Sequence, residues 1–366
     1  MYTERVKRLE ERLTTKQCEL AFITSPIHIF YYTNFLSEPH ARFFAYVYDQ
    51  TKEKSYLFLP TLDYDKAKSL AKVDELIPVS DVENGYEKMK ATLGRNFSSI
   101  AVEKETMTLA ELDRLQAVFS NLNLLQIDNF SIEERLNKQA TEIEQVKKAI
   151  DITEQGLEHI VQFVKPGMTE MEIKQELEFK LFSLGAEQMA FDTLVLSGKN
   201  SSLPHGTSGN NEVKEGDFLL FDFGVTVNGY NSDITRTFIV GEASEEQKVI
   251  YDTVKRANED AILKVKVDVP LKEVDLAARN VIEKANYGKY FTHRVGHGLG
   301  LEVHELPSIH SENNELMRKG MLFTIEPGIY GPDLGGVRIE DNIFINESGK
   351  AEVLTTYPKQ LITIEP

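Results

Sequence analysis

The stretch FLLFDFGVTVNGYNSDITRT, residues 218–237, predicts a β-hairpin that carries two acidic residues. Two β-rich runs flank Asn228-Gly229, and Asn-Gly between such runs is the strongest short-range signal for a two-residue hairpin turn. With this turn, Asp222 lies opposite Thr235. Asp222 and Asp233 then lie diagonally on one face of neighbouring strands, roughly 7–8 Å apart at the backbone.

Burying the ionised carboxylates of this hairpin costs free energy. Asp222 lies between Phe221 and Phe223 in an otherwise apolar strand. An ionised carboxylate buried in such a strand is expensive unless a cation or a hydrogen-bond donor compensates it. Asp222 and Asp233 side by side therefore predict a metal site.

Two further acids interrupt apolar β runs near the end of the chain. Glu326 lies in FTIEPG and Glu340 lies in VRIEDN, and each would be buried if its strand were. Arg338 could neutralise one of these acids in a structural ion pair. Four such acids in one half of the chain favour a shared cation instead.

A glycine-rich segment, HRVGHGLGLEVHE at residues 293–305, supplies histidines close together in the chain. Three of the eight histidines fall in it, His293, His297 and His304. Their spacing is not that of HExxH, so a helical zinc-protease site is not supported.

The resulting inventory of four carboxylates and one imidazole predicts the metal and the reaction. Hard oxygen ligands with one nitrogen favour Mn²⁺, Co²⁺ or Fe²⁺ over a thiolate-rich zinc site, and four negative charges balance two divalent ions. Two-metal sites hold their ions about 3.5–4 Å apart, activate water and polarise a carbonyl, so amide hydrolysis is the expected reaction. His205, in LPHG, and His304 could supply donors to the developing oxyanion or to the leaving group.

Composition excludes several other classes of protein. The chain has 366 residues, 41% hydrophobic and 27% charged, which is ordinary for a globular protein long enough for two domains. A formal net charge of −17 argues against nucleic acids and anionic membranes as partners. The single cysteine, Cys18, fits a reducing compartment. The N-terminus is charged throughout and no apolar run could span a bilayer, so we expect a cytoplasmic protein.

The order of patterns along the chain predicts two domains. Residues 1 to about 130 alternate helix and strand signals, which indicates an α/β layer with a mixed sheet. We expect strands there at 19–24, 43–48, 55–59 and 100–102, a turn at Ser25-Pro26, and helices at 3–16, 64–71 and 109–119. A polar link near 130–138 precedes helices at 140–164, 171–185, 245–265 and 271–285. A helix pair followed by a hairpin occurs twice in residues 140–345, which hints at a pseudo-symmetric sheet with helices on one side.

Five motifs together resemble a known family. FDFG, NSDITRT, GHGLGLEVHE, TIEPG and RIEDN are similar, in this order, to those of the pita-bread metallopeptidases, which include prolidase, aminopeptidase P and methionine aminopeptidase. The likeness covers residues 138–358. It implies five metal ligands for two ions, with Asp233 and Glu340 bridging them: Asp222, Asp233, His297, Glu326 and Glu340. It also implies substrate and intermediate contacts by His205, His293 and His304, proton transfer by Glu326, and Arg338 beside a substrate carboxylate.

The N-terminal part resembles the creatinase-type domain of prolidases and aminopeptidase P. The resemblance implies an α/β (α+β) fold in which residues 1–132 form this domain. Residues 133–366 then form a catalytic pita-bread domain with a curved antiparallel sheet and helices on its outer face. The N-terminal domain of this group usually helps to form a dimer and closes over the pocket.

The activity implied is hydrolysis of the bond before proline in Xaa-Pro dipeptides, with two divalent ions, Mn²⁺ first and Co²⁺, Fe²⁺ or Zn²⁺ as alternatives. The alternative is an aminopeptidase P that acts on longer Xaa-Pro peptides. A non-catalytic binding protein of the same fold is a remote third reading, because such relatives have lost ligands that are present here. A phosphotransferase reading rests on the three letters DFG and lacks the other kinase motifs.

Overall fold

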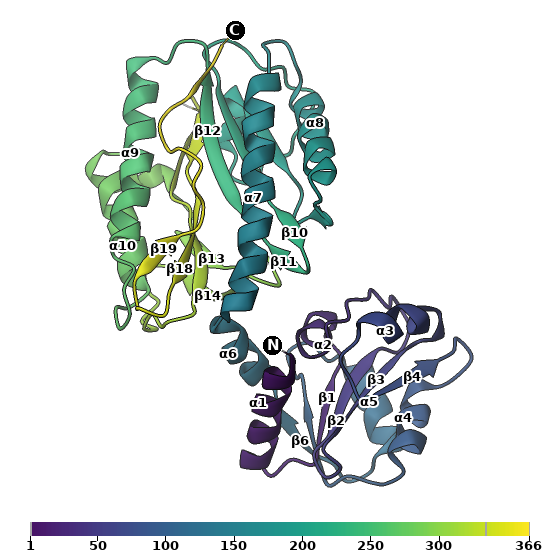
Figure 1. Ribbon diagram of the computed structural model, residues 1–366. Helices are drawn as coiled ribbons and strands as arrows, with labels where there is room; N and C mark the ends of the chain where they lie inside the picture. Colours follow the sequence, from purple (N-terminus) through teal and green to yellow (C-terminus); the bar gives the residue numbers. More distant parts are fainter. Residues whose placement is uncertain (1, 334, 366) are drawn as a thin grey trace. The chain divides into compact units, whose positions relative to one another are not determined.

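The computed structural model describes residues 2–333 and 335–365, which form two compact units, one ending at Glu134 and the other beginning at Arg135 (Figure 1). Among the described residues, no helix combines the length and the apolar character needed to cross a bilayer.

The N-terminal unit is built on a six-stranded mixed sheet in the order β4-β3-β2-β1-β5-β6. The β1–β2 and β2–β3 pairs are antiparallel and the other three are parallel, so the mixed sheet expected from the sequence is confirmed. Its strands are β1 (Leu20–Ile23), β2 (Ala45–Asp49), β3 (Lys54–Pro60), β4 (Glu75–Val79), β5 (Ser99–Val102) and β6 (Asn123–Gln126). Its helices are α1 (Tyr2–Thr15), α2 (Pro26–Thr33), α3 (Tyr64–Leu70), α4 (Gly85–Leu93), α5 (Leu109–Val118) and α6 (Asp128–Leu136), which runs across the division between the units.

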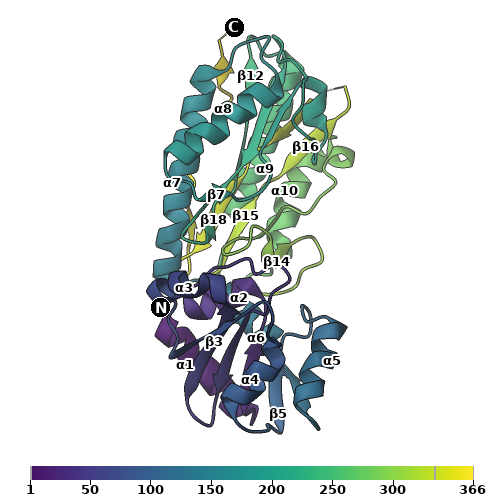
Figure 2. The same cartoon turned by 90° about the vertical axis from the view of Figure 1, so that its right-hand side faces the viewer.

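One core cluster of this unit lies between the sheet and two of its helices. Figure 2 shows α4 and α5 next to β5. Met89 of α4 and Leu115 of α5 pack with strand residues such as Phe22 and Phe58. Burying such side chains contributes about 1.5–3 kcal/mol each, which is the main stabilisation of a layer of this kind.

Helix α2 corrects one expectation from the sequence. Pro26 does not form a turn with Ser25 but is the first residue of a helix, where its missing N–H costs nothing. The aromatic residues that follow, including Tyr31 and Tyr32, are fully buried, as expected of core residues.

The C-terminal unit contains four described sheets, in which the strand pairs are antiparallel except for β12 with β20. The sheet orders are β20-β12-β9-β8, β14-β13-β15-β18-β19, β11-β10-β7 and β16-β17. The strands are β7 (Gln188–Met189), β8 (Leu194–Ser197), β9 (Phe218–Phe223), β10 (Val225–Val227), β11 (Tyr230–Asn231), β12 (Ile234–Val240), β13 (Gly296–Gly298), β14 (Glu305–Ile309), β15 (Leu322–Ile325), β16 (Gly328–Gly331), β17 (Gly335–Arg338), β18 (Asp341–Ile345), β19 (Ala351–Val353) and β20 (Thr363–Ile364).

Two helix pairs cover the two larger sheets of this unit. They are α7 (Ala140–Phe163) with α8 (Glu170–Ser183), and α9 (Glu245–Ile262) with α10 (Lys272–Lys284). Leu157 and Leu177 of the first pair pack on Phe221 of β9. Residues of the second pair pack on β15 and β18, and Figure 1 shows α9 and α10 beside the yellow strands β18 and β19. One helix pair for each sheet agrees with the duplication suggested by the sequence.

The hairpin at residues 218–237 has the predicted register. Asp222 lies opposite Thr235, and Asn228-Gly229 forms the turn with φ values of 50° and 80°, as a type I′ turn requires. At Gly224 the two strands come so close that a Cβ atom would lie 1.9 Å from the carbonyl oxygen of Ser232. Only glycine fits at this point, between the two acids of the hairpin.

Candidate active site

One cavity of about 490 Å³ in the C-terminal unit brings together all nine side chains that the sequence predicted to be functional. Eight further residues among those described line it, of which Phe191, Leu194, Pro204 and Val303 are apolar. The nine are His205, Asp222, Asp233, His293, His297, His304, Glu326, Arg338 and Glu340.

Strands, or the residues directly beside them, position the acids and His297. Asp222 lies within β9 and His297 is the central residue of β13. Asp233 directly precedes β12, and Glu326 directly follows β15. Glu340 lies between β17 and β18. The backbones are therefore fixed by sheet hydrogen bonds before any ligand arrives, which is how a precise site is held.

Three of these residues are close enough to share one cation. Suitable ligand atoms of Asp233, His297 and Glu340 all lie within 4.8 Å of one another. His297 Nε2 is 3.7 Å from Asp233 Oδ2 and 3.2 Å from Glu326 Oε1. Asp233 Oδ1 and Glu340 Oε1 are buried and accept no hydrogen bond from the described residues. Buried carboxylate oxygens without partners are costly, and a divalent cation would satisfy both.

The pKa values of the four acids reflect burial first and the neighbouring charges second. Burial, together with the neighbouring carboxylates, raises the pKa of Asp233 and of Glu340 well above the ordinary values. Burial also raises the pKa of Asp222, partly offset by Arg338. Burial would raise the pKa of Glu326 too, but the hydrogen bond and charge of His297, with His293 and Arg338, lower it to about 2. A cation among these acids would favour their ionised forms.

Arg338 forms the ion pair that the sequence left open, and its partner is Asp222. Its guanidinium is buried, with Nη1 donating to Tyr330 Oη at 2.7 Å and Nε donating to Thr235 Oγ1 at 3.0 Å. Thr235 Oγ1 in turn donates to Glu340 Oε2 at 2.8 Å. With its four carboxylates ionised and Arg338 charged, the site carries three net negative charges. No role for Tyr330 or Thr235 was predicted from the sequence. Thr235 had one usable signal: it follows Asp233 by two residues, so the two side chains point to the same face of the strand.

The three remaining histidines, His205, His293 and His304, approach the cavity from different loops, and the surroundings of His293 and His304 lower the pKa of each. His293 Nε2 lies 3.0 Å from Tyr330 Oη, and burial lowers the pKa of His293. The ring of His304 stands edge-on to that of His297, with centroids 4.2 Å apart. Burial and the neighbouring His297 lower the pKa of His304 to about 4. Both imidazoles are therefore neutral at pH 7 and can donate or accept a hydrogen bond without carrying charge.

His205 lies in a loop that a buried glutamate organises. Glu170, at the start of α8, accepts hydrogen bonds from the backbone N–H groups of Ser197 and Gly209, at 2.7 and 3.0 Å. The side-chain amides of Asn200 and Asn211 also donate to it. No local pattern indicates this role, because Glu170 follows a capping threonine in an ordinary helix start.

Comparison with known families identifies both parts of the chain. Residues 144–347 match the profile described as Metallopeptidase family M24. The chain belongs to metallopeptidase family M24. Residues 5–136 match the Creatinase/Prolidase N-terminal domain, so the two-part fold and the family expected from the sequence are confirmed.

Relatives and solved structures of M24 enzymes cover almost the whole chain. YkvY of Bacillus subtilis, provisionally named a dipeptidase, is 39% identical over 363 residues, 98% of this chain and 99% of its own. The structure of an Xaa-Pro dipeptidase from Bacillus anthracis superposes with a TM-score of 0.90 at 31% identity, covering 99% of this chain and 100% of that one. An X-Pro aminopeptidase from Thermotoga maritima gives 0.89 at 33% identity, covering 98% and 100%. The chain is a metallopeptidase whose relatives act on peptides.

Proposed function

We propose that this M24 enzyme hydrolyses the peptide bond before proline in Xaa-Pro dipeptides, using two divalent ions, with Mn²⁺ as the first candidate. The observation that carries the proposal is the convergence of four carboxylates and one imidazole on a single cavity, with two buried carboxylate oxygens that accept no hydrogen bond among the described residues. We propose that five residues hold the ions, namely Asp222, Asp233, His297, Glu326 and Glu340.

The ions, when bound, would lower the pKa of a coordinated water toward about 7 and polarise the scissile carbonyl. The protein groups around them would do the rest. Glu326 would accept a proton at an oxygen of its ionised carboxylate. His205, His293 and His304 would hydrogen-bond the substrate and the developing oxyanion as neutral imidazoles.

The cavity size supports a small peptide as substrate. A volume of about 490 Å³ falls in the range of roughly 300–1,000 Å³ that small-molecule sites occupy. Hydrogen bonds to Asp222, Tyr330 and Thr235 use three of the five N–H donors of Arg338. We propose that the remaining donors contact the substrate carboxylate.

The test is a comparison of two peptides with purified protein after its metal content has been measured. Mn²⁺-loaded enzyme should cleave Ala-Pro efficiently and Ala-Pro-Ala poorly. Efficient tripeptide cleavage with an inert dipeptide would replace the proposal by the second candidate, an aminopeptidase P. The similarity to the Thermotoga maritima X-Pro aminopeptidase favours that candidate. Asp233→Ala should abolish activity in either case, and unchanged hydrolysis would refute its role as a ligand.

We further propose that residues 1–132 act as the creatinase-like domain and residues 133–366 as the catalytic domain of a cytoplasmic homodimer. Light scattering coupled to size exclusion would measure the assembly directly, and a monomeric mass would contradict the dimer.

A further inference from the structure

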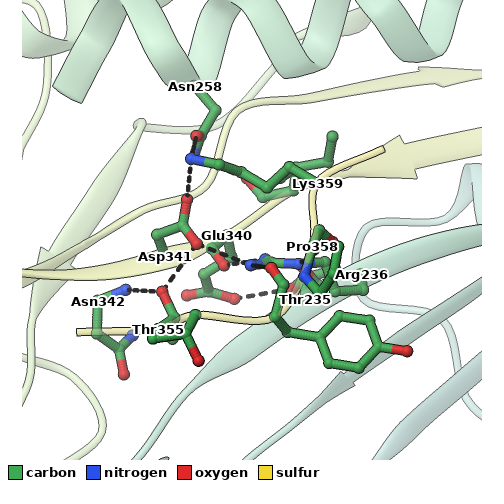
Figure 3. Close-up of polar contacts among 12 residues, drawn as sticks. Thr235, Arg236, Asn258, Glu340, Asp341, Asn342, Thr355, Pro358 and Lys359 are labelled. Atoms are coloured by element: carbon green, nitrogen blue, oxygen red, sulfur yellow. Dashed lines mark hydrogen bonds and ion pairs between the residues drawn. The ribbon is translucent and has the colours of Figure 1, made fainter. Parts of the chain in front are cut away.

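A buried charged cluster lies between β12 and β18, next to the candidate site. Asp341 accepts hydrogen bonds of 2.8 Å from Arg236 Nη2, Lys359 Nζ and Thr355 Oγ1 (Figure 3). The side chains of Arg236 and Asp341 are each 1% exposed. Buried ion pairs of this kind are often no more stabilising than apolar residues of similar volume. Stability alone therefore gives no reason for the cluster. The other hydrogen bonds donated by Arg236 indicate a different role.

Arg236 uses Nη1 on backbone carbonyls beside the site, whereas its Nε and Nη2 also donate to the carbonyl oxygens of Pro358 and Tyr357, at 3.2 and 2.8 Å. Nη1 donates to the carbonyl oxygen of Glu340 and, at 3.0 Å, to that of Thr235. The N–H of Glu340 donates to the same Thr235 oxygen at 3.1 Å. One guanidinium thus fixes the backbone of Glu340 against the strand that follows Asp233 (Figure 3).

Two asparagines reach the backbone of the other acids. Asn342 Nδ2 donates to the carbonyl oxygen of Asp233 at 2.7 Å. Asn258, on α9, donates to the carbonyl oxygen of Ile325, directly before Glu326, at 3.0 Å, and to that of Ile339, directly before Glu340, at 3.4 Å. Lys359 Nζ donates to Asn258 Oδ1 at 2.9 Å, which joins Asn258 to the charged cluster (Figure 3).

The burial of Asn342 supports a specific role for its amide. The residue is fully buried, yet Oδ1 accepts no hydrogen bond from the described residues. An unpartnered amide oxygen is costly, whereas an apolar side chain of the same shape would avoid that cost. The hydrogen bond from Nδ2 to Asp233 is what an asparagine supplies here and a leucine could not.

We propose that Arg236, Asn258, Asn342 and Asp341 are positioning residues that set the backbone of three metal-binding acids, Asp233, Glu326 and Glu340, so that the carboxylates converge on the ions. This proposal rests on the proposed function. The carboxylates repel one another, so without such an anchor their strands would relax apart. Groups that orient ligands in this way typically change metal affinity by about 10- to 100-fold when they are altered.

Three variants separate positioning from simple stabilisation. Asn342→Leu keeps the volume and removes the hydrogen bond to Asp233 as well as an unpartnered oxygen, so it should fold. Arg236→Lys keeps the charge beside Asp341 but cannot reach several carbonyls at once. Asn258→Asp keeps the contact with Lys359 and removes both donors. Tyr230→Phe is the matched control, because it removes one buried hydrogen bond, from Tyr230 Oη to Glu142, in the same unit.

The measurements are the Mn²⁺ dissociation constant of the metal-free full-length protein by calorimetry, the visible spectrum of the Co²⁺ form, and the melting temperature without metal. We expect Asn342→Leu, Arg236→Lys and Asn258→Asp to weaken Mn²⁺ binding about 10- to 100-fold and to change the Co²⁺ spectrum. Tyr230→Phe should leave the Mn²⁺ dissociation constant and the Co²⁺ spectrum unchanged.

Variants that lower the metal-free melting temperature but bind Mn²⁺ like the wild type would overturn the proposal. That result would assign the network to stability only. A wild-type protein that binds no Mn²⁺ or Co²⁺ would instead refute the proposed function, so the two failures can be told apart.

Discussion

Substituting Gly224 by alanine should damage the site more than the fold. A Cβ at this position would lie 1.9 Å from the carbonyl oxygen of Ser232 and 3.3 Å from the Cα of Asp233. Real Cβ atoms essentially never approach closer than 3.0 Å, so the strands would have to separate by at least about 1.1 Å. The neighbouring atoms are backbone, which cannot move aside as a flexible side chain can.

The consequence follows from where this separation occurs. Gly224 lies between Asp222 and Asp233 in the hairpin, so the displacement changes the distance between two proposed ligands. Metal–ligand distances tolerate deviations of only about 0.2 Å. A misplacement of about 1 Å in an active site can cost about 100-fold in rate. Overpacking itself should cost about 1–3 kcal/mol of stability, which a domain of this size survives.

The assay compares kcat/KM for Ala-Pro, the Mn²⁺ dissociation constant and the melting temperature of Gly224→Ala with those of Gly209→Ala. Gly209 is the control, because a Cβ there would meet nothing within 4 Å. We expect Gly224→Ala to lose about 100-fold in kcat/KM with weaker metal binding. A folded Gly224→Ala protein with the wild-type kcat/KM and the wild-type Mn²⁺ dissociation constant would refute this reasoning.

Other substitutions probe the charges around the site. Glu305→Gln should lower the stability at pH 7 by about 3–5 kcal/mol, because Lys138 and Arg135 then lose a buried partner. Burial would raise the pKa of Glu305, but these two cations lower it below 4.5. The stabilisation is therefore present above pH 4.5 and is lost as the pH falls through the lower pKa of the folded state. The free energy of unfolding of the variant, measured with urea, should therefore depend less on pH in the acid range than that of the wild type. Mn²⁺ at 100 times its dissociation constant should stabilise the metal-free protein by about 2.7 kcal/mol, and a thermal shift that persists in Asp233→Ala would contradict binding at this site. Glu170→Gln should lower kcat/KM through the His205 loop while the calorimetric Mn²⁺ affinity stays unchanged; an equal loss of both would contradict this separation of roles.

Much of the site was predictable because its residues break local rules. Acids inside apolar strands and a type I′ turn at Asn228-Gly229 are signals that need no knowledge of the rest of the fold. They placed Asp222, Asp233, Glu326 and Glu340 correctly on or beside strands. The hairpin register followed from the turn alone.

Other features depended on contacts distant in sequence. The pairing of Arg338 with Asp222 joins positions 116 residues apart, so no local pattern indicates which acid the guanidinium chooses. Strand β4 was missed because Pro78 interrupts its pattern, and the sheet order places it at an edge, where proline is tolerated. The roles of Glu170, Arg236 and Asn342 are set by buried backbone carbonyl and N–H groups, which the sequence does not reveal.

The hydrogen bond between Thr235 and Glu340 has a consequence for biosynthesis. These residues are 105 positions apart, and both must be in place before the two halves of the pocket meet. Closing so long a loop is entropically costly, and only packing of the completed unit can offset that cost. A chain still being translated would therefore offer an ion at most the two carboxylates of the hairpin, Asp222 and Asp233. Metal loading would then follow folding, in contrast to a zinc finger, whose metal drives its folding.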